Sequence, residues 1–262
     1  MAARAKLGRM IDVTVHGRTA VITLDRQEAR NAINGEVARG LEAAVERFEA
    51  DDDLWCAVLA ARGPVFSAGA DLKLFGEGRD REMFTEKGHF GGFVRYPRTK
   101  PCIAAVDGPA LAGGCELVLA CDLIVASTAA RFGLPEVKRS LVASAGGLAR
   151  LPRMLPAPVA AYVMLTGDPI DGQRAYDLGM VCELTEPGGA LDAALALAER
   201  INANAPLAVR HTLRILQQAP DQTFEETWKE GRRATRALAE TEDYREGPRA
   251  FVEKRAPVWR GR

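Results

Sequence analysis

The sequence predicts an α/β fold, with a mainly parallel β-sheet and a helical region appended at its C-terminal end. Short apolar runs typical of buried strands alternate with segments of helical periodicity through most of the chain. The last sixty of the 262 residues carry helix signals and essentially no strand signal. We therefore expect a core that holds the functional site at residues 1–200 and a C-terminal helical region at residues 201–262.

The chain begins with a predicted β-hairpin, because Ile11–Val15 and Thr19–Leu24 alternate apolar and polar residues around a glycine-containing turn. A helix is expected at Glu36–Phe48 and an apolar strand at Trp55–Ala60. Residues 72–98 are polar and dotted with glycines, which indicates short helical pieces and mobile loops that could cover a pocket.

The rest of the core continues the alternation of strands and helices. Asp171 is a plausible N-cap for one of these helices, and Gly179 is its expected stop. Strands are expected at Pro101–Val106, Leu123–Ala126 and Val181–Leu184, and helices at Gly113–Ala120, Ala145–Leu151, Ala157–Leu165, Gly172–Leu178, Pro187–Ala203 and Leu207–Gln218.

Composition excludes several classes of function. Lysine plus arginine and aspartate plus glutamate number 35 each, so the net charge is zero and no nucleic-acid partner is expected. No apolar run reaches about 18 residues and no secretory signal is evident, so we expect no membrane span and a cytoplasmic protein. The cysteines show no CxxC spacing and the three histidines lie far apart, so no metal site is predicted.

Glu116 is the most informative single residue. It is the only charge in the run Leu111–Ala120, and burial of a charge costs several kcal/mol unless it is compensated. Gly113 and Gly114 lie just before it, where a backbone can approach a ligand and where a helix is expected to begin. The run therefore predicts a place where backbone N–H groups and a carboxylate meet one substrate.

A second glycine motif, Phe66–Lys73, also follows an expected strand, and Asp71 in it can cap the next helix. Each motif alone fits an ordinary strand–turn–helix connection. Together, two such turns can direct two N–H donors at one oxygen, an arrangement worth about 3–4 kcal/mol per donor in acyl-transfer enzymes.

In this order and at these distances, the motifs resemble those of the crotonase family (enoyl-CoA hydratase/isomerase), and the likeness covers nearly the whole chain. The segments that carry the resemblance are Leu24–Ala32, Phe66–Lys73, Val106–Leu117, Phe132–Glu136, Leu165–Gly167, Gly179–Val181 and Glu246–Arg255.

The resemblance implies a ClpP/crotonase spiral of ββα repeats followed by a C-terminal trimerisation region. It also implies a homotrimer, or a hexamer built as a dimer of trimers, that acts on acyl-CoA thioesters in fatty acid metabolism. Coenzyme A would be part of the substrate, so no separate cofactor is expected. The neutral net charge gives no support for a role in RNA binding.

Matched positions imply individual roles. Glu116 and Glu136 would be the catalytic carboxyls, and the N–H groups of Ala70 and Gly113 would form the oxyanion hole. Phe251 and Lys254 would contact coenzyme A from a neighbouring subunit. The other expected contacts to substrate or coenzyme A are Glu28, Ala29, Asn31, Ala68, Gly69, Asp71, Leu72, Gly114 and Ser144.

The leading hypothesis is a 2-enoyl-CoA hydratase, because both glutamates are present at the twenty-residue spacing that hydratases of the family show. Ser144 departs from the family pattern, since it replaces a glycine whose N–H usually helps to hold the water. Another acyl-CoA lyase or isomerase, such as a carnitinyl-CoA dehydratase, remains an alternative, as does a non-catalytic acyl-CoA-binding protein.

Overall fold

The computed structural model describes residues 4–6 and 9–262 of the chain. Its main sheet runs in the order β1-β2-β3-β4-β7-β9-β12, and the strands from β3 to β12 are parallel. The predicted parallel sheet is therefore confirmed. The strands of this sheet are β1 (Arg4–Lys6), β2 (Ile11–His16), β3 (Thr19–Leu24), β4 (Cys56–Ala61), β7 (Cys102–Val106), β9 (Leu123–Ser127) and β12 (Glu183–Thr185).

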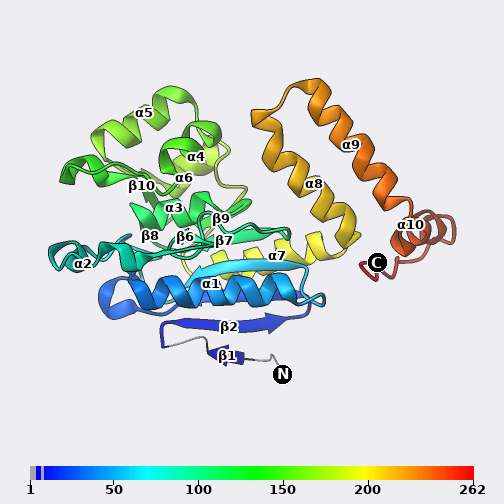
Figure 1. Ribbon diagram of the computed structural model, residues 1–262, viewed down its shortest axis with the longest axis horizontal. Helices are drawn as coiled ribbons and strands as arrows, with labels where there is room; N and C mark the ends of the chain where they lie inside the picture. Colours follow the sequence, from blue (N-terminus) through cyan, green and yellow to red (C-terminus); the bar gives the residue numbers. More distant parts are fainter. Residues whose placement is uncertain (1–3, 7–8) are drawn as a thin grey trace.

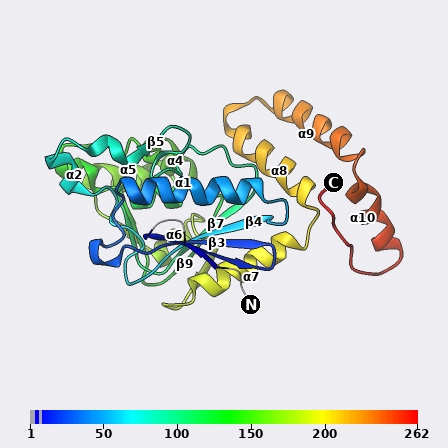
Figure 2. The same cartoon turned by 60° about the horizontal axis from the view of Figure 1, so that its bottom comes forward.

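The predicted hairpin is confirmed as β2 and β3, which pair antiparallel from Ile11 opposite Leu24 to His16 opposite Thr19. Helix α1 (Gly35–Ala50) begins where the Asn34 side chain accepts a hydrogen bond from the Val37 N–H. Its apolar face packs into the core that also contains the inward face of the hairpin. Figures 1 and 2 show this helix along one face of the sheet.

Helix α7 (Ala190–Asn202) lies against the other face of the sheet (Figure 2). Its buried alanines Ala190, Ala194 and Ala198 pack against Val58 and Ile103 of the central strands. Small side chains at i, i+4 and i+8 allow the helix to approach the sheet closely. The predicted start at Pro187 is too early, because residues 187–189 form the turn that precedes the helix.

A second, smaller sheet was not predicted. It contains β8 (Pro109–Leu111), β10 (Arg131–Gly133) and β11 (Ile170–Asp171), and single bridges join Ser67 to Ala110 and Ile33 to Ala70. Strands of two or three residues are too short to show an alternating pattern. This sheet matters because it places successive strand-to-helix turns side by side.

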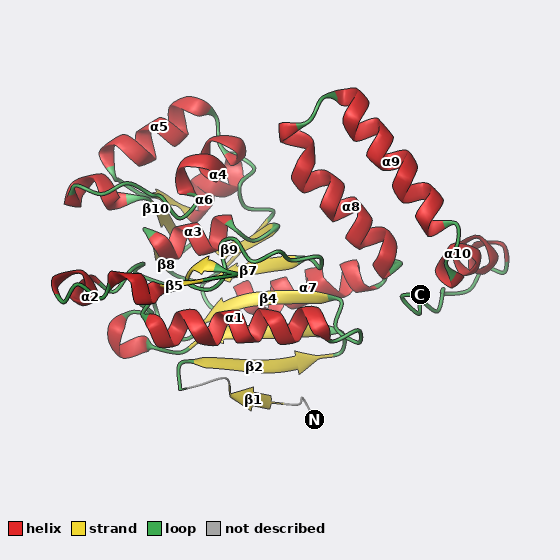
Figure 3. Cartoon of the chain, viewed as in Figure 1, coloured by secondary structure: helices red, strands yellow, loops and turns green. Residues whose placement is uncertain are grey.

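Four helices complete the core above the main sheet (Figure 3). The predicted N-cap is confirmed, since the Asp171 side chain accepts from the Arg174 N–H at 2.8 Å. Each predicted helix exists, with ends that differ by a few residues. The helices are α3 (Gly113–Leu119), α4 (Gly147–Met154), α5 (Ala157–Thr166) and α6 (Gly172–Asp177).

The segment 72–98 contains short elements, as expected: helix α2 (Leu72–Gly76), a 3₁₀ turn at Asp80–Met83 and the two-residue strands β5 (Phe84–Thr85) and β6 (His89–Phe90). Met83, Phe90 and Phe93 are buried in the main core. The segment is therefore anchored to the core at several points.

The C-terminal region is helical, as predicted, and comprises α8 (Pro206–Gln218), α9 (Phe224–Leu238) and α10 (Glu242–Val252). These helices extend to one side of the core (Figure 1). Phe224 and Phe251 are at least 80% exposed. The Trp259 Nε1–H donates to the Ala203 carbonyl and so joins the end of the chain to the segment between α7 and α8.

We expect Gly114→Ala to lower the free energy of unfolding by about 2 kcal/mol, because a Cβ there would lie 2.4 Å from the Ser67 carbonyl oxygen. Gly231→Ala, in the middle of α9 with no atom within 4 Å of its added Cβ, should raise it by up to about 1 kcal/mol. Urea denaturation of both variants measures the difference. Equal effects of the two substitutions would contradict the close packing at Gly114.

Candidate active site

A cavity of about 810 Å³ opens where the two glycine motifs meet. It is bounded by the first loop after β3, the Phe66–Lys73 motif, the start of α3 and the segment that follows β10. Ten of the residues proposed from the sequence line this cavity: Glu28, Ala29, Ala68, Ala70, Asp71, Leu72, Gly113, Glu116, Glu136 and Ser144.

The two motifs touch each other through their backbones. A Cβ on Gly69, which has φ +91°, would lie 2.9 Å from the Gly113 nitrogen and 2.8 Å from the Ala112 Cβ. Real Cβ atoms do not approach so closely, so a side chain at position 69 would push the turns apart. Glycine at position 69 therefore brings the Ala70 and Gly113 backbones into one small region.

The local backbone leaves two N–H groups available there. Ile33 pairs with the neighbours of Ala70, because its N–H donates to the Gly69 carbonyl and its carbonyl accepts from the Asp71 N–H. Successive N–H groups of an extended chain point to opposite sides, so the Ala70 N–H points away from Ile33. Gly113 is the first residue of α3, where an N–H has no acceptor within the helix.

Ala112 holds the turn into α3 in an unusual conformation, with φ 51° and ψ −130°. Its N–H donates to the Gly133 carbonyl, and its own carbonyl accepts from the Glu116 N–H at 3.0 Å. A residue other than glycine rarely adopts positive φ, and such strain is concentrated at functional sites. Here it allows a short strand to turn directly into a helix whose first N–H groups border the cavity.

Phe90 closes the cavity beside Gly113. A Cβ at position 113 would lie 2.4 Å from the Phe90 ring, so the ring packs directly on the glycine. Phe84 meets the Phe90 ring edge-on with centroids 5.7 Å apart. Together with Met83 and Phe75, these side chains give one wall of the cavity an apolar surface.

Glu116 lies on α3 with only 3% of its surface exposed. The Gly147 N–H, at the start of α4, donates to its Oε1 at 2.9 Å. Burial raises the pKa of Glu116 to about 7; the Gly147 hydrogen bond opposes this rise and the nearby Glu136 adds to it. At neutral pH this carboxyl is therefore present in both its protonated and its ionised form, so it can give up or accept a proton.

Glu136 lies in the 3₁₀ turn Pro135–Arg139 and is half-buried. Its Oε2 is buried and has no hydrogen-bond partner among residues 4–6 and 9–262. Burial also raises the pKa of Glu136. Two carboxyls twenty residues apart in the chain thus share one cavity, and the charge of Glu136 helps to raise the pKa of Glu116.

Ser144 lines the cavity beside these carboxyls, but its N–H donates to the Val142 carbonyl at 2.8 Å. This N–H is therefore already paired with a backbone carbonyl of its own loop.

Three other predicted contacts do not line the cavity. Gly69 and Gly114 shape the turns, as described above. The Asn31 side chain is buried: it accepts from the Arg26 N–H and donates to the carbonyls of Arg62 and Val65. Asn31 therefore fixes the fold of the first loop through three hydrogen bonds and contacts no part of the cavity.

Phe251 and Lys254 lie at the end of α10 and just beyond it, and Figure 1 shows α10 on the opposite side of the molecule from α2. Their predicted contact with coenzyme A from a neighbouring subunit stays a prediction. Sequence reasoning did not assign Arg26, Arg30, Lys73 and Arg139 to the site, although they lie within or beside its motifs and line the cavity. The positive charge of these side chains, so close to the two glycine motifs, was the feature of the sequence that could have identified them as cavity residues.

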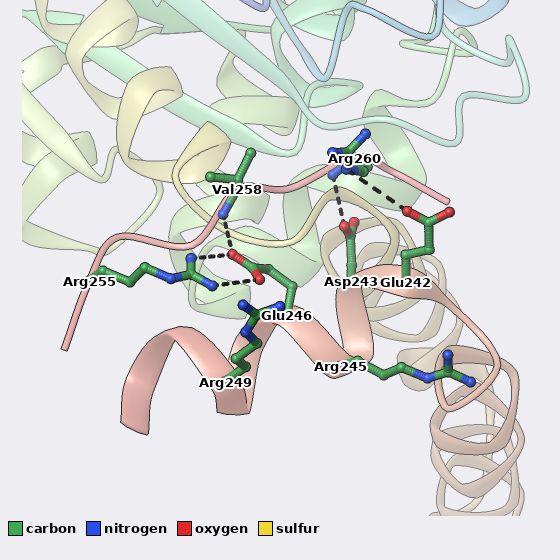
Figure 4. A pocket seen from close by; sticks show the side chains of 8 residues that line it. All are labelled: Glu242, Asp243, Arg245, Glu246, Arg249, Arg255, Val258 and Arg260. Atoms are coloured by element: carbon green, nitrogen blue, oxygen red, sulfur yellow. Dashed lines mark hydrogen bonds and ion pairs between the residues drawn. The ribbon is translucent and has the colours of Figure 1, made fainter. Parts of the chain in front are cut away.

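A second cavity, of about 570 Å³, lies at the C-terminal end (Figure 4). Arg255 in it pairs with Glu246. Buried Asp243 accepts hydrogen bonds from the N–H groups of Arg260 and Gly261. These contacts hold the chain end against α10, and none of the predicted catalytic residues lines this cavity.

A ββα spiral with two N–H donors and two carboxyls at one cavity is typical of crotonase-fold enzymes. The chain belongs to the enoyl-CoA hydratase/isomerase family, whose model matches residues 15–262. Within residues 4–6 and 9–262, no helix is long and apolar enough to cross a membrane.

Similar proteins support this assignment over nearly the whole chain. The enoyl-CoA hydratase EchA19 of Mycobacterium tuberculosis is 37% identical over 252 residues, which is 94% of each protein. A carnitinyl-CoA dehydratase of Citrobacter koseri is 36% identical over 98% of this chain and all of its own length. The crystal structure of an enoyl-CoA hydratase from M. tuberculosis H37Rv is 45% identical, with a TM-score of 0.92 and coverage of 97% of this chain and 99% of its own.

We expect Glu116→Gln to flatten the pH dependence of folding stability. The pKa of Glu116 is raised from 4.5 to about 7 in the folded protein, so the folded state holds this proton more tightly than the unfolded state. The proton's contribution to the free energy of unfolding is fully present below pH 4.5 and is lost as the pH rises through 7. The loss should amount to about 3 kcal/mol, which the uncharged glutamine would not show. Urea unfolding at pH 5 and pH 8 tests this, and an identical pH dependence in both proteins would contradict it.

Proposed function

We propose that the chain catalyses the reversible addition of water to the double bond of 2-enoyl-CoA thioesters. The observation that carries the proposal is the meeting of two backbone N–H donors and two carboxyls with raised pKa values at one cavity. The names of the similar proteins point to the same chemistry.

In this proposal the thioester oxygen accepts hydrogen bonds from the N–H groups of Ala70 and Gly113. Addition at C3 moves negative charge onto that oxygen as an enolate forms. Two fixed donors that strengthen as the charge develops lower the barrier more than they strengthen substrate binding. The helix that begins at Gly113 directs the positive end of its dipole at the same point.

The carboxyls of Glu116 and Glu136 carry the protons. The ionised carboxyl of the pair takes a proton from water, the resulting hydroxide oxygen bonds to C3, and C2 gains a proton from the pair or through the same water. One carboxyl must be ionised and one protonated, and a raised pKa for both groups favours a shared proton near neutral pH. The two roles can be divided between the glutamates in either order.

The loops around the cavity would bind the rest of the substrate. Glu28, Ala29 and Ala68 would face coenzyme A near the entrance, and Asp71 and Leu72 would follow its pantetheine arm. Phe251 and Lys254 would complete this site from a second copy of the chain in a trimer or hexamer. Their exposure on an extended helical arm supports this, because neither contacts the cavity of its own chain. We propose a cytoplasmic enzyme of fatty acid metabolism.

A carnitinyl-CoA dehydratase is the second candidate, because such a protein matches this chain over its whole length. It would use the same two carboxyls in the reverse direction, to remove water from a hydroxyacyl thioester. Turnover of crotonyl-CoA, longer enoyl-CoAs and hydroxylated acyl-CoAs, each followed by product analysis, distinguishes the two candidates.

We expect Glu116→Gln and Glu136→Gln each to lower kcat for hydration by at least about 100-fold, because each removes a proton carrier from the pair. Loss of absorbance by the conjugated thioester measures the rate. Glu82→Gln, which changes a half-exposed carboxylate paired with Arg79, is the control and should keep wild-type turnover. Unchanged hydration in both test variants would refute the proposed function, and binding of acyl-CoA without turnover by the wild type would favour a non-catalytic role.

A further inference from the structure

Arg150 is a cation near enough to Glu116 to lower the pKa of its carboxyl. It is the fourth residue of α4, three positions after Gly147, whose N–H holds the Glu116 carboxyl. Its guanidinium is half-buried and donates from Nη2 to the Val94 carbonyl at 2.6 Å and from Nη1 to the Ala145 carbonyl at 3.5 Å. One side chain thus joins the turn 145–147 to the segment before β7.

The turn is shaped around this guanidinium. Gly146 has φ +114°, and a Cβ there would lie 1.9 Å from the Arg150 Nη1. The positive φ favours glycine at this position, and a side chain there would displace the end of Arg150. Arg150 and the turn that presents the Gly147 N–H consequently form one packed unit.

The other end of the link also reaches the site. Val94 lies four residues after Phe90, and its N–H donates to the Phe90 carbonyl. The Phe90 ring packs on Gly113. Arg150 therefore connects the group that holds Glu116 to the segment that packs against the Gly113 donor.

The charges around Glu116 come from several elements. Glu136, from the 3₁₀ turn after β10, raises its pKa, and Arg150, from α4, lowers it. Cys115, the neighbour of Glu116 on α3, is kept neutral because burial raises the pKa of its thiol. Arg150 is thus the cation that opposes the effects of burial and of Glu136.

Arg150 itself has like-charged neighbours. Arg98 and Arg95, in the segment before β7, act together with burial to lower its pKa. Arginine nevertheless stays charged at any ordinary pH. A cation held near two other arginines must be stabilised by its hydrogen bonds to the carbonyls of Val94 and Ala145, and the charge of Glu116 acts on it in the same sense.

We propose that Arg150 is a positioning residue for the hydration reaction: it locks the turn 145–147 against the segment 90–94 so that the Gly147 N–H meets the Glu116 carboxylate. It lies outside the residues that line the cavity and acts through Glu116. This inference rests on the proposed function for its kinetic consequences, but the contact it describes exists independently of turnover.

The test compares Arg150→Gln and Arg150→Lys with Arg153→Gln. Arg153 lies one turn further along α4, is half exposed and pairs with Asp221, so it is the matched control. Crotonyl-CoA hydration is measured from pH 5 to pH 9. Arg150→Gln should lower kcat about tenfold or more through misplacement of the carboxyl, and KM should change less than about twofold.

The pH profile separates positioning from simple loss of folding. Removal of the cation should move the limb of the bell-shaped profile that Glu116 sets to higher pH in Arg150→Gln, since that carboxyl becomes harder to ionise. Arg150→Lys keeps the charge but cannot bridge two carbonyls in a planar fork, so its limbs should stay in place while kcat falls. A wild-type kcat and profile in Arg150→Gln, or a uniform loss that matches the unfolded fraction, would overturn the proposal.

A second readout does not depend on catalysis. In protein labelled with ¹³C at glutamate carboxyls, the Glu116 signal is identified by its absence in Glu116→Gln, and its titration midpoint is followed by NMR. The midpoint should rise in Arg150→Gln and stay unchanged in Arg153→Gln. An unchanged midpoint in Arg150→Gln would overturn the inference. Failure of the wild type to hydrate any enoyl-CoA would refute the proposed function alone.

Discussion

The close approach of two strand-to-helix turns is the constraint on which the rest of the structure depends. Gly69 lies where a Cβ would strike the Gly113 nitrogen, and Gly114 lies where a Cβ would strike the Ser67 carbonyl. The short second sheet holds both turns in register through the bridge between Ser67 and Ala110. Because the turns touch, two backbone N–H groups border one cavity and α3 begins at its edge. Glu116, one turn into that helix, is carried to the same place.

Burial makes the ionised form of a carboxyl unfavourable in free energy, and the surroundings of Glu116 offset this penalty only in part. Burial and Glu136 favour the neutral form, while backbone hydrogen bonds from Gly147 and Ala145 and the cation of Arg150 favour the ionised form. The result is a pKa of about 7, where the two forms have similar free energies. A fully compensated carboxylate would stay ionised at neutral pH, and an uncompensated one would stay protonated. Either would serve proton transfer less well.

The sequence predicts the main sheet and most helices because their apolar patterns are long enough to show the period of a strand or a helix. It predicts Glu116 because a lone charge in an apolar run is conspicuous, whereas Glu136 depends on family resemblance, since a glutamate after a proline fits any surface loop. The strands β8, β10 and β11 are missed because two or three residues show no period. Asn31 lies in a matched loop, yet only the folded backbone reveals that its side chain turns inward. The role of Arg150 depends on contacts across 56 residues of chain, which no local pattern encodes.

The central claim is that one cavity presents the two N–H groups to a thioester oxygen and the two carboxyls to the adjacent carbons. A crystal structure with bound butyryl-CoA tests it most directly, because the saturated acyl group cannot be hydrated. We predict a thioester oxygen about 2.7–3.1 Å from the nitrogens of both Ala70 and Gly113, with C2 and C3 facing Glu116 and Glu136. A thioester oxygen bound elsewhere, or an acyl group directed away from the two glutamates, would contradict the account.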